Sequence, residues 1–399
     1  MLLGDRKFKP PTLRDHDETP ERHATWLELF FDLAFVAVLG QISVNLAKSH
    51  DFNSILIFFG LFVPIWWSWV GQVFFQSRFD ADDLSHRVAT FVQIVILGLM
   101  ATMIPKAFAG DPTGFALSYT AMRGVLILQY LLAGHYISAA RVLTSRYSMG
   151  FSIAAGFWIA SVFIPQPFNY LFWAIGIFFD FLTPNLCAAL NIEFPPHPGH
   201  TPERFGLFTI IVLGEAIIAT VGTLSGVSLN KPGMVAAILG LLLACAVWWV
   251  YFEGVGAADQ RVPKSENGVV RYRSWLYGHL PLHAGIILMA VGVERVILQP
   301  INPLSGYEPY LLPCSVGVVM VMMHVFNNSS VSREIRRENR KYIRPHFFVT
   351  ALILPVFVLA SSLTPLAILS LCFFIFLSHV LLNIRGYPAS MESAVANQD

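Results

Sequence analysis

Charged residues are scarce in this 399-residue chain: Asp, Glu, Lys and Arg make up 13% of it, whereas hydrophobic residues make up 55%. A soluble domain carries roughly 25% charged residues, which cover its surface. The shortage therefore argues against an ordinary soluble protein and predicts a surface that faces lipid. The formal net charge of +1 offers no overall field for a polyanion, so no nucleic-acid partner is expected.

Cysteine and the motifs of soluble enzymes are also rare or missing. The four cysteines lie inside apolar runs without the spacing of a metal or redox site, which makes disulfides unexpected: Cys187, Cys245, Cys314 and Cys372. No Gly-rich phosphate loop with Lys, no HExxH and no GxSxG occurs in the sequence. We therefore predict no catalytic residue, no cofactor and no resident metal, and we do not expect ATP-driven pumping by this chain alone.

Long apolar runs are abundant instead. A membrane-spanning helix needs about 20 mostly apolar residues. Twelve segments satisfy this requirement, and the polar first 25 residues do not read as a signal peptide, so the first span is expected to be retained. The predicted spans are 25–46, 53–75, 88–105, 117–138, 149–164, 168–190, 204–225, 233–253, 275–298, 310–326, 346–362 and 364–384.

The distribution of Lys and Arg predicts the orientation. These residues accumulate in cytoplasmic loops. If the N-terminus is cytoplasmic, 21 of the 26 Lys and Arg residues fall on the inside and 5, including Arg123 and Arg295, on the outside. The sequence therefore predicts an even number of spans with both termini in the cytoplasm, in a multi-pass protein of the plasma membrane.

An internal repeat divides the chain into two halves. Glu21-Arg22 and Trp66-Trp67 recur as Glu203-Arg204 and Trp248-Trp249, all 182 residues further on. Six spans per repeat give both halves the same orientation, so the repeats should be parallel and related by an axis along the membrane normal. The predicted segments are a cytoplasmic N-terminal segment 1–24, a first repeat 25–192, a linker 193–203, a second repeat 204–384 and a cytoplasmic tail 385–399.

Ionisable residues within predicted spans are costly and mark candidate functional sites. Glu28 and Asp32 lie one helical turn apart in the first span. Arg204 and Glu215 share a face of the seventh, with Glu215 about 15 Å into the bilayer. The repeat makes Asp32 and Glu215 candidates to face each other across a central pathway. The alternative is a structural role, in which each carboxylate bonds to the backbone or to a neighbouring Arg.

Other polar residues fall at similar depth. Asp180 lies near mid-membrane, and its repeat counterpart region contains His379, a combination that suits either a proton relay or a buried packing pair. In the ninth span His279, His283 and Glu294 share one face. We interpret this stripe as the lining of a water-filled cavity rather than a metal site, because no third ligand is evident.

The loop between the second and third spans carries a charge cluster of Arg78, Asp80, Asp82, Asp83 and Arg87. Aspartates at a membrane surface can hold magnesium against a lipid diphosphate. The matching loop of the second repeat has fewer acids, so an Arg–Asp network that ties the loop together is the plainer interpretation.

Four motifs in order resemble the low temperature requirement protein A (LtrA) family of bacterial and fungal membrane proteins: RHATWLELFFDLAFV, SRFDADDLSHR, ERFGLFTIIVLGEAI and HAGIILMAVGVE. The resemblance runs from about Glu21 to Leu382. It implies a membrane protein with no established reaction. The residues that it carries over are Glu28, Asp32, Arg78, Asp80, Asp82, Arg87, Glu203, Arg204, Glu215 and Glu294.

A local similarity concerns the first span alone. The residues 30–35, FFDLAF, look like the first helix of the lysosomal potassium/proton channel family, which has a Phe-Ser-Asp signature preceded by Arg and two six-helix repeats. Here Phe31 replaces the serine and Trp26 stands at the arginine position. The similarity implies an ion pathway near Asp32.

Together these patterns predict a channel or secondary transporter for a small ion or solute, with proton coupling as an option. The alternatives are a metal-dependent membrane enzyme acting on a lipid or isoprenoid, and a sensor of membrane state. The expected partners are the lipid bilayer and the transported solute, and a homodimer is compatible with the sequence.

Overall fold

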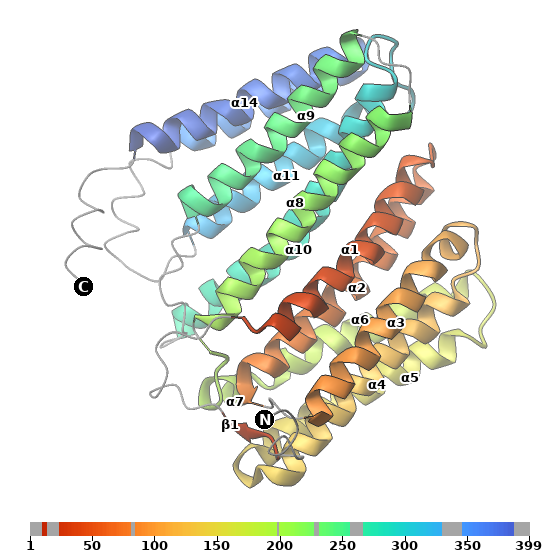
Figure 1. Cartoon of the computed structure of the whole chain (residues 1–399), viewed down its shortest axis with the longest axis vertical. Coiled ribbons are helices and arrows are strands. Elements are labelled where there is room, and N and C mark those ends of the chain that lie inside the picture. Colours follow the sequence, from red (N-terminus) through yellow and green to blue (C-terminus); the bar gives the residue numbers. More distant parts are fainter. Residues whose placement is uncertain are drawn as a thin grey trace, which may run out of the picture. The chain divides into compact units, whose positions relative to one another are not determined.

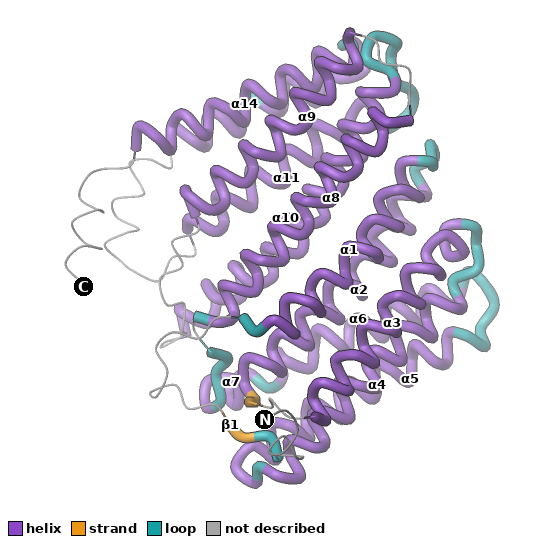
Figure 2. Tube along the Cα trace, in the orientation of Figure 1, coloured by secondary structure: helices purple, strands orange, loops and turns teal. Residues whose placement is uncertain are grey.

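The structure, a computed structural model, describes residues 10–13, 24–80, 84–197, 199–226, 231–255, 266–328 and 345–386. Figure 2 shows that these residues are almost entirely helical. The chain forms two compact units. Unit 1 comprises Met1–Asn45 and Asn53–Ile211, and unit 2 comprises Leu46–Phe52 and Val212–Asp399.

Ten helices in the described part of the chain are long and apolar enough to cross a membrane. This finding confirms the predicted all-α membrane protein. Helices α5 (Arg141–Ser161) and α6 (Phe168–Leu186) form where the fifth and sixth spans were predicted, but they are not among the ten. The two helices carry the polar residues Arg146 and Asp180, which interrupt their apolar runs.

Unit 1 is a bundle in which successive helices pack as neighbours. Figure 1 shows α3, α4, α5 and α6 side by side, and α4 contacts α2, α3 and α5. A short antiparallel pair, β1 (Thr12–Leu13) with β2 (Phe79–Asp80), closes one end. The other helices are α1 (Trp26–Ala47), α2 (Asn53–Arg78), α3 (Leu84–Phe108), α4 (Thr113–Tyr136) and α7 (Ala188–Glu193), and the turn η1 (Ser138–Ala140) links α4 to α5.

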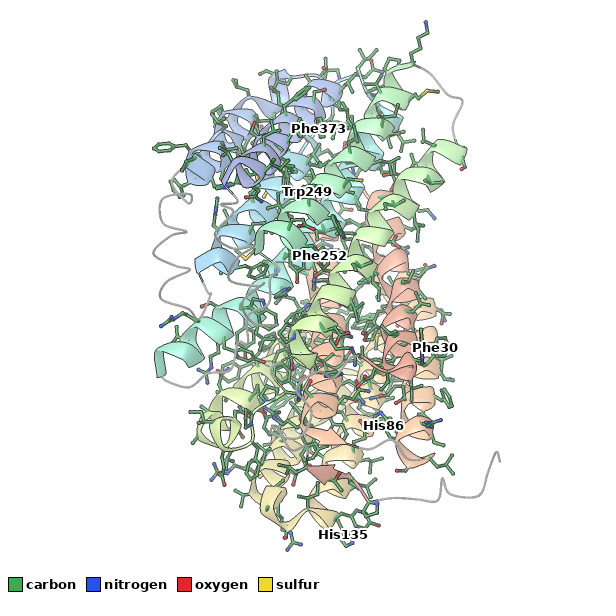
Figure 3. All side chains as sticks on the ribbon, turned by 60° about the vertical axis from the view of Figure 1, so that its left-hand side comes forward. Phe30, His86, His135, Trp249, Phe252 and Phe373 are labelled. Atoms are coloured by element: carbon green, nitrogen blue, oxygen red, sulfur yellow. The ribbon has the colours of Figure 1, made fainter. Side chains whose placement is uncertain are left out.

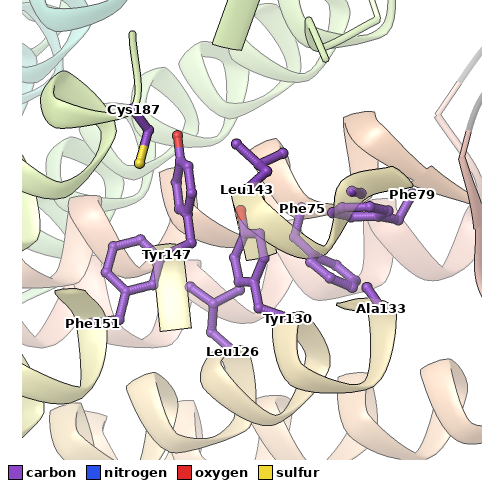
Figure 4. Close-up of a cluster of buried hydrophobic side chains, with 10 residues drawn as sticks. Phe75, Phe79, Leu126, Tyr130, Ala133, Leu143, Tyr147, Phe151 and Cys187 are labelled. Carbon is purple, nitrogen blue, oxygen red and sulfur yellow. The ribbon is translucent and has the colours of Figure 1, made fainter. Parts of the chain in front are cut away.

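An aromatic cluster fills the interior of unit 1 where α2, α4 and α5 meet (Figure 4). Tyr130 is central to it. Its ring stacks on that of Tyr147 at 5.1 Å between centroids and meets the edge of Phe75 at the same distance. Lipid supplies little hydrophobic force between helices, so contacts of this kind carry much of their association.

Small residues let the helices of unit 1 approach closely. A Cβ added at Gly150 on α5 would lie 2.1 Å from Thr183 Oγ1 on α6. A Cβ added at Gly71 on α2 would lie 2.9 Å from Arg123 Nη1 on α4. Both glycines are therefore required by packing against a named neighbour.

Unit 2 contains the second set of long helices, of which α9, α11 and α14 run side by side in Figure 1. Helix α9 passes into a π-helical turn, η2, and a helix beginning at Pro345 leads through α13 and the turn η3 to α14. The bounds are α8 (His200–Gly226, which crosses the boundary between the units), α9 (Lys231–Trp249), η2 (Val250–Val255), α10 (Glu266–Leu298), α11 (Glu308–Asn328), α13 (Ile353–Leu359), η3 (Ala360–Ser362) and α14 (Pro365–Gly386).

Several helix ends differ from the predicted spans. Helix α5 begins at Arg141, eight residues before the predicted span 149–164, because η1 turns the chain directly from α4 into α5. Helix α10 begins at Glu266, nine residues before the predicted span 275–298. Both extensions are polar, so an apolar-run criterion stops short of them.

Exposed apolar side chains are widespread, as expected of a lipid-facing surface. Figure 3 shows Phe30 and Trp249 on the outside of their helices. The two repeated tryptophan pairs have different surroundings: Trp66 is fully buried, whereas Trp249 is 39% exposed. His135, whose surroundings resemble those of His324 in sequence, is exposed at one end of unit 1.

Candidate functional site

The site of greatest interest is an ionic cluster inside unit 1, formed by Glu28 and Asp32 on α1 with His200 and Arg204 on α8. None of the four residues is more than 2% exposed. Each pair is four residues apart on its helix, which places both members on one face. We call this group the α1–α8 cluster.

Arg204 forms a bidentate ion pair with Asp32. Its Nε donates to Asp32 Oδ2 at 2.8 Å, and its Nη2 donates to Oδ1 at 2.6 Å. This fork-to-fork geometry is the strongest form of the Arg–carboxylate bond. The third guanidinium nitrogen, Nη1, donates to Gln76 Oε1 at 2.9 Å. Asp32 accepts a third hydrogen bond, from Trp69 Nε1, at 2.8 Å.

Glu28 has two roles in the cluster. It forms a capping box with Thr25: the Thr25 backbone N–H donates to Glu28 Oε2 at 2.8 Å, and the Glu28 N–H donates to Thr25 Oγ1 at 3.3 Å. The same carboxylate lies 3.5 Å from Arg204 Nη1 and 3.2 Å from His200 Nε2. The other ring nitrogen of His200 lies 3.0 Å from Ser77 Oγ.

Aromatic rings cover the cluster. The Trp69 ring stacks on Phe208 with 4.1 Å between centroids, and Phe205 meets its edge at 4.8 Å. Phe35 packs edge-on against Phe208. In this low-dielectric setting the charges act strongly on one another. Two carboxylates, Glu28 and Asp32, face the Arg204 guanidinium, and the His200 ring lies beside Glu28.

A second buried network surrounds Asp180. The Tyr119 hydroxyl donates to Asp180 Oδ2 at 2.6 Å, and Arg123 Nε lies 3.3 Å from Oδ1. Arg123 also donates to the Tyr119 oxygen through two nitrogens, at 2.7 and 2.9 Å. The orientation count assigned Arg123, within the predicted span 117–138, to the outer side of the membrane. The structure instead buries it within α4, where an Arg in the middle of an apolar run was the overlooked signal.

A small pocket opens near this network at the end of unit 1. Trp173 lines it and stands two turns, about 10.5 Å along α6, from Asp180. Its polar lining consists of Asp111, Thr113, Ser161, Gln166 and Asn169.

In unit 2 the predicted residues Glu215 and Glu294 come together. Glu215 on α8 and Glu294 on α10 are near enough for their charges to repel each other. Asp32 belongs to unit 1 and Glu215 to unit 2, so their predicted apposition stays a prediction.

The histidines of α10 are packed among aromatic rings. His279 Nε2 lies 2.9 Å from the Tyr251 hydroxyl, and the ring stacks on Phe326 at 4.4 Å. His283 lies 5.5 Å from His279 between ring centroids, and both are fully buried. Across the described ranges, no group of three His, Cys, Asp or Glu side chains is arranged to hold a metal ion.

The predicted cytoplasmic network is described only in part. Arg78 is buried, and it donates to Asn191 Oδ1 at 2.8 Å and to the Phe194 carbonyl at 3.1 Å. Arg87 lies in the first turn of α3. Asp82, Asp83 and the side chain of Asp80 lie outside the described residues, so their predicted contacts stay predictions.

Sequence reasoning missed a further network at the end of α10. The guanidinium of Arg295 pairs with Glu308 and donates through Nη2 to the carbonyl of Ser49 at 2.5 Å. His50 Nδ1 contacts Glu308 at 2.6 Å. Tyr307, in the loop beside Arg295, is partly buried, and this burial raises the pKa of its hydroxyl against the opposing pull of Arg295.

The helices and buried charges define a multi-pass integral membrane protein. Residues 23–381 match the family model described as bacterial low temperature requirement A protein (LtrA), and the chain therefore belongs to the LtrA family. It is also similar to RA0937, an uncharacterized protein of Rhizobium meliloti (strain 1021), with 30% identity over 301 residues that cover 71% of this chain and 72% of the relative. No solved structure matches the chain.

Proposed function

We propose that this protein is a secondary transporter of a small cation, with proton coupling, and that the α1–α8 cluster is its ion-sensitive site. The observation that carries the proposal is the burial of two carboxylates, Glu28 and Asp32, around the Arg204 guanidinium. Ionisable groups at membrane depth are costly and commonly mark ion pathways. A proton on His200 or a bound cation would be attracted to these two carboxylates.

The geometry also suggests how an ion could act. A proton or cation that binds Asp32 competes with Arg204, because the carboxylate has both oxygens engaged by the guanidinium. Release of Arg204 would free α8 from α1. The exchange would thereby link ion binding to a change in helix packing, which transport requires.

The proposal includes an arrangement in the membrane. Helices α5 and α6 would complete a set of twelve spans, because paired helices of 21 and 19 residues are joined by a short turn at Pro165 and Pro167. The two halves would be parallel repeats with both termini in the cytoplasm, and the plasma membrane would be the site of action. The repeated sequence motifs and the distribution of Lys and Arg support this arrangement.

Liposome flux measurements with the purified protein test the function. When a pH gradient is imposed across the liposome membrane, wild-type protein should move a small monovalent cation in response to it. The double variant Asp32→Asn and Glu215→Gln should lower this cation flux at least about tenfold. Unchanged flux in the double variant would remove the carboxylates from the pathway. Absence of flux for wild type across a panel of cations would overturn transport.

Glu28→Gln separates charge from structure. Glutamine also serves at this position of a capping box, so the start of α1 should be retained. The substitution removes the charge of Glu28 while the Arg204–Asp32 pair stays intact. We expect lost proton coupling in a folded protein, and coupling at the wild-type level would show that the charge of Glu28 has no functional meaning.

A further inference from the structure

Three histidines from three helices meet in unit 2 through a threonine. His324 is on α11, His346 and Thr350 are on the helix that begins at Pro345, and His379 is on α14. The ring centroids of His346 and His379 are 4.8 Å apart, and those of His324 and His379 are 5.5 Å apart. We call these four residues the histidine chain.

Polar atoms link the residues end to end. His346 Nδ1 lies 2.9 Å from His379 Nδ1. The other nitrogen of His379, Nε2, lies 3.1 Å from Thr350 Oγ1, and Thr350 Oγ1 lies 2.7 Å from His324 Nε2. Since His379 uses its two nitrogens toward two different neighbours, the rings form a line of hydrogen bonds and do not converge on one metal position.

The distances allow a head-to-tail arrangement of protons. His346 Nδ1–H can donate to His379 Nδ1, and His379 Nε2–H can donate to Thr350 Oγ1. Thr350 Oγ1 lies 3.0 Å from the His346 carbonyl oxygen and 2.7 Å from His324 Nε2, and in the relay the hydroxyl donates to His324 in place of that carbonyl. A proton that joins His346 at Nε2 releases the proton at Nδ1 to His379. Each following member passes on one proton, and His324 ends as an imidazolium with a proton on both nitrogens.

Both ends of the histidine chain keep part of their residue surface accessible: His346 is 8% exposed, and His324 is partly exposed. His324 Nδ1 is buried and has no hydrogen-bond partner in the described structure. In the described part of unit 2, the ionisable groups that influence each of these three imidazoles are the other imidazoles of the histidine chain.

We propose that the histidine chain is a proton relay that carries a proton between the imidazoles of His346 and His324, the two ends of the line of hydrogen bonds. As a supply of protons for coupled transport, it rests on the proposed function. The transfer itself is a property of the four residues and can be measured separately.

Thr350→Val and Thr350→Ser form a matched pair for the test. Valine keeps the shape of the side chain but removes the hydroxyl that joins His379 to His324, whereas serine keeps the hydroxyl. Proton flux into liposomes that contain pyranine should fall about tenfold in Thr350→Val and stay within about twofold of wild type in Thr350→Ser. Wild-type flux should also be slower in deuterium oxide.

Nitrogen-15 NMR of the full-length protein, labelled at histidine in lipid bilayers, provides the second readout. Wild type should show the N–H···N coupling between His346 and His379, which His379→Gln should abolish, and proton exchange at His324 should slow in Thr350→Val. If wild type carries no flux but shows these signals, the proposed function fails and the relay stands. The relay would be overturned if folded Thr350→Val kept proton flux and proton exchange at the wild-type levels. Stoichiometric Zn²⁺ binding that depends on all three histidines would overturn it as well.

Discussion

Asp32→Asn should be among the most destabilising single changes in unit 1. Asp32 accepts three hydrogen bonds of 2.6 to 2.8 Å, two from Arg204 and one from Trp69. An asparagine at this position offers one oxygen in place of two, and its amide N–H groups would face the N–H donors of its neighbours. The guanidinium would stay buried, with the Glu28 carboxylate 3.5 Å away.

The magnitude follows from the burial of both partners. Removing one member of a buried ion pair costs about 3–5 kcal/mol, because the other charge is left without compensation. The residual attraction of Glu28 places our expectation near the lower end, at about 3 kcal/mol. Arg204→Gln should cost a similar amount, but the combined variant should lose much less than the sum, since neither charge is then left alone.

Unfolding by SDS titration in mixed micelles measures these free energies. Glu193→Gln, which neutralises an exposed acid at the end of α7, serves as the matched control and should change the free energy of unfolding by less than about 0.5 kcal/mol. If Asp32→Asn costs no more than this control, or if the two single changes simply add, Asp32 and Arg204 are not a coupled pair and the reasoning fails.

Gly71→Ala should lower the free energy of unfolding by about 1–3 kcal/mol in the same assay, because the new Cβ would lie 2.8 Å from Leu126 and 2.9 Å from Arg123. Gly60→Ala on the same helix is the control: its Cβ would meet nothing within 4 Å, so the change should be neutral or stabilising. Equal effects of the two changes would refute the close approach at Gly71. Tyr119→Phe should lower the free energy of unfolding by about 1.5–3 kcal/mol, since Arg123 and Asp180 both form hydrogen bonds with the Tyr119 hydroxyl. Tyr170→Phe, at a partly exposed residue, is the control, and a smaller loss for Tyr119→Phe than for this control would contradict the network. Burial raises the pKa of the Tyr307 hydroxyl in the folded protein. The stability that the neutral hydroxyl contributes is therefore complete below the ordinary tyrosine pKa, and it is lost as the pH rises through the pKa of the folded protein. The difference between the alkaline absorbance titrations of wild type and Tyr307→Phe should show a transition above the ordinary tyrosine range of about pH 10, and a transition at or below this range would contradict the assignment.

The sequence could predict the long helices because lipid imposes a simple length and apolarity requirement. It failed at helix ends such as the start of α5, where Arg141 and Arg146 continue the helix as polar residues. Burial of Asp32 was equally predictable, because this carboxylate stands out in an apolar run. Arg204 stands at the edge of its apolar run and was counted among the cytoplasmic residues, yet it is buried inside unit 1.

Partners were much harder to predict than positions. Helical periodicity identifies the face of a residue but not what lies opposite, and Asp32 and Arg204 are separated by 172 residues. The repeat suggested Glu215 as the neighbour of Asp32 and placed His379 in the counterpart region of Asp180. The partners that the structure gives, Tyr119 for Asp180 and His346 for His379, lie on other helices and could not be read from the sequence.

The two buried acid–base groups of unit 1 differ in a way that bears on function. Asp180 meets Arg123, so its network is electrically neutral and its hydrogen bonds to Tyr119 fix the packing of α4 against α6. The α1–α8 cluster has a second carboxylate, Glu28, and an imidazole, His200, beside its Arg–Asp pair. Our proposal therefore assigns the proton or cation response to Asp32 and Glu28, which together surround the Arg204 guanidinium. Neutralising Asp180 should weaken the fold without changing ion selectivity.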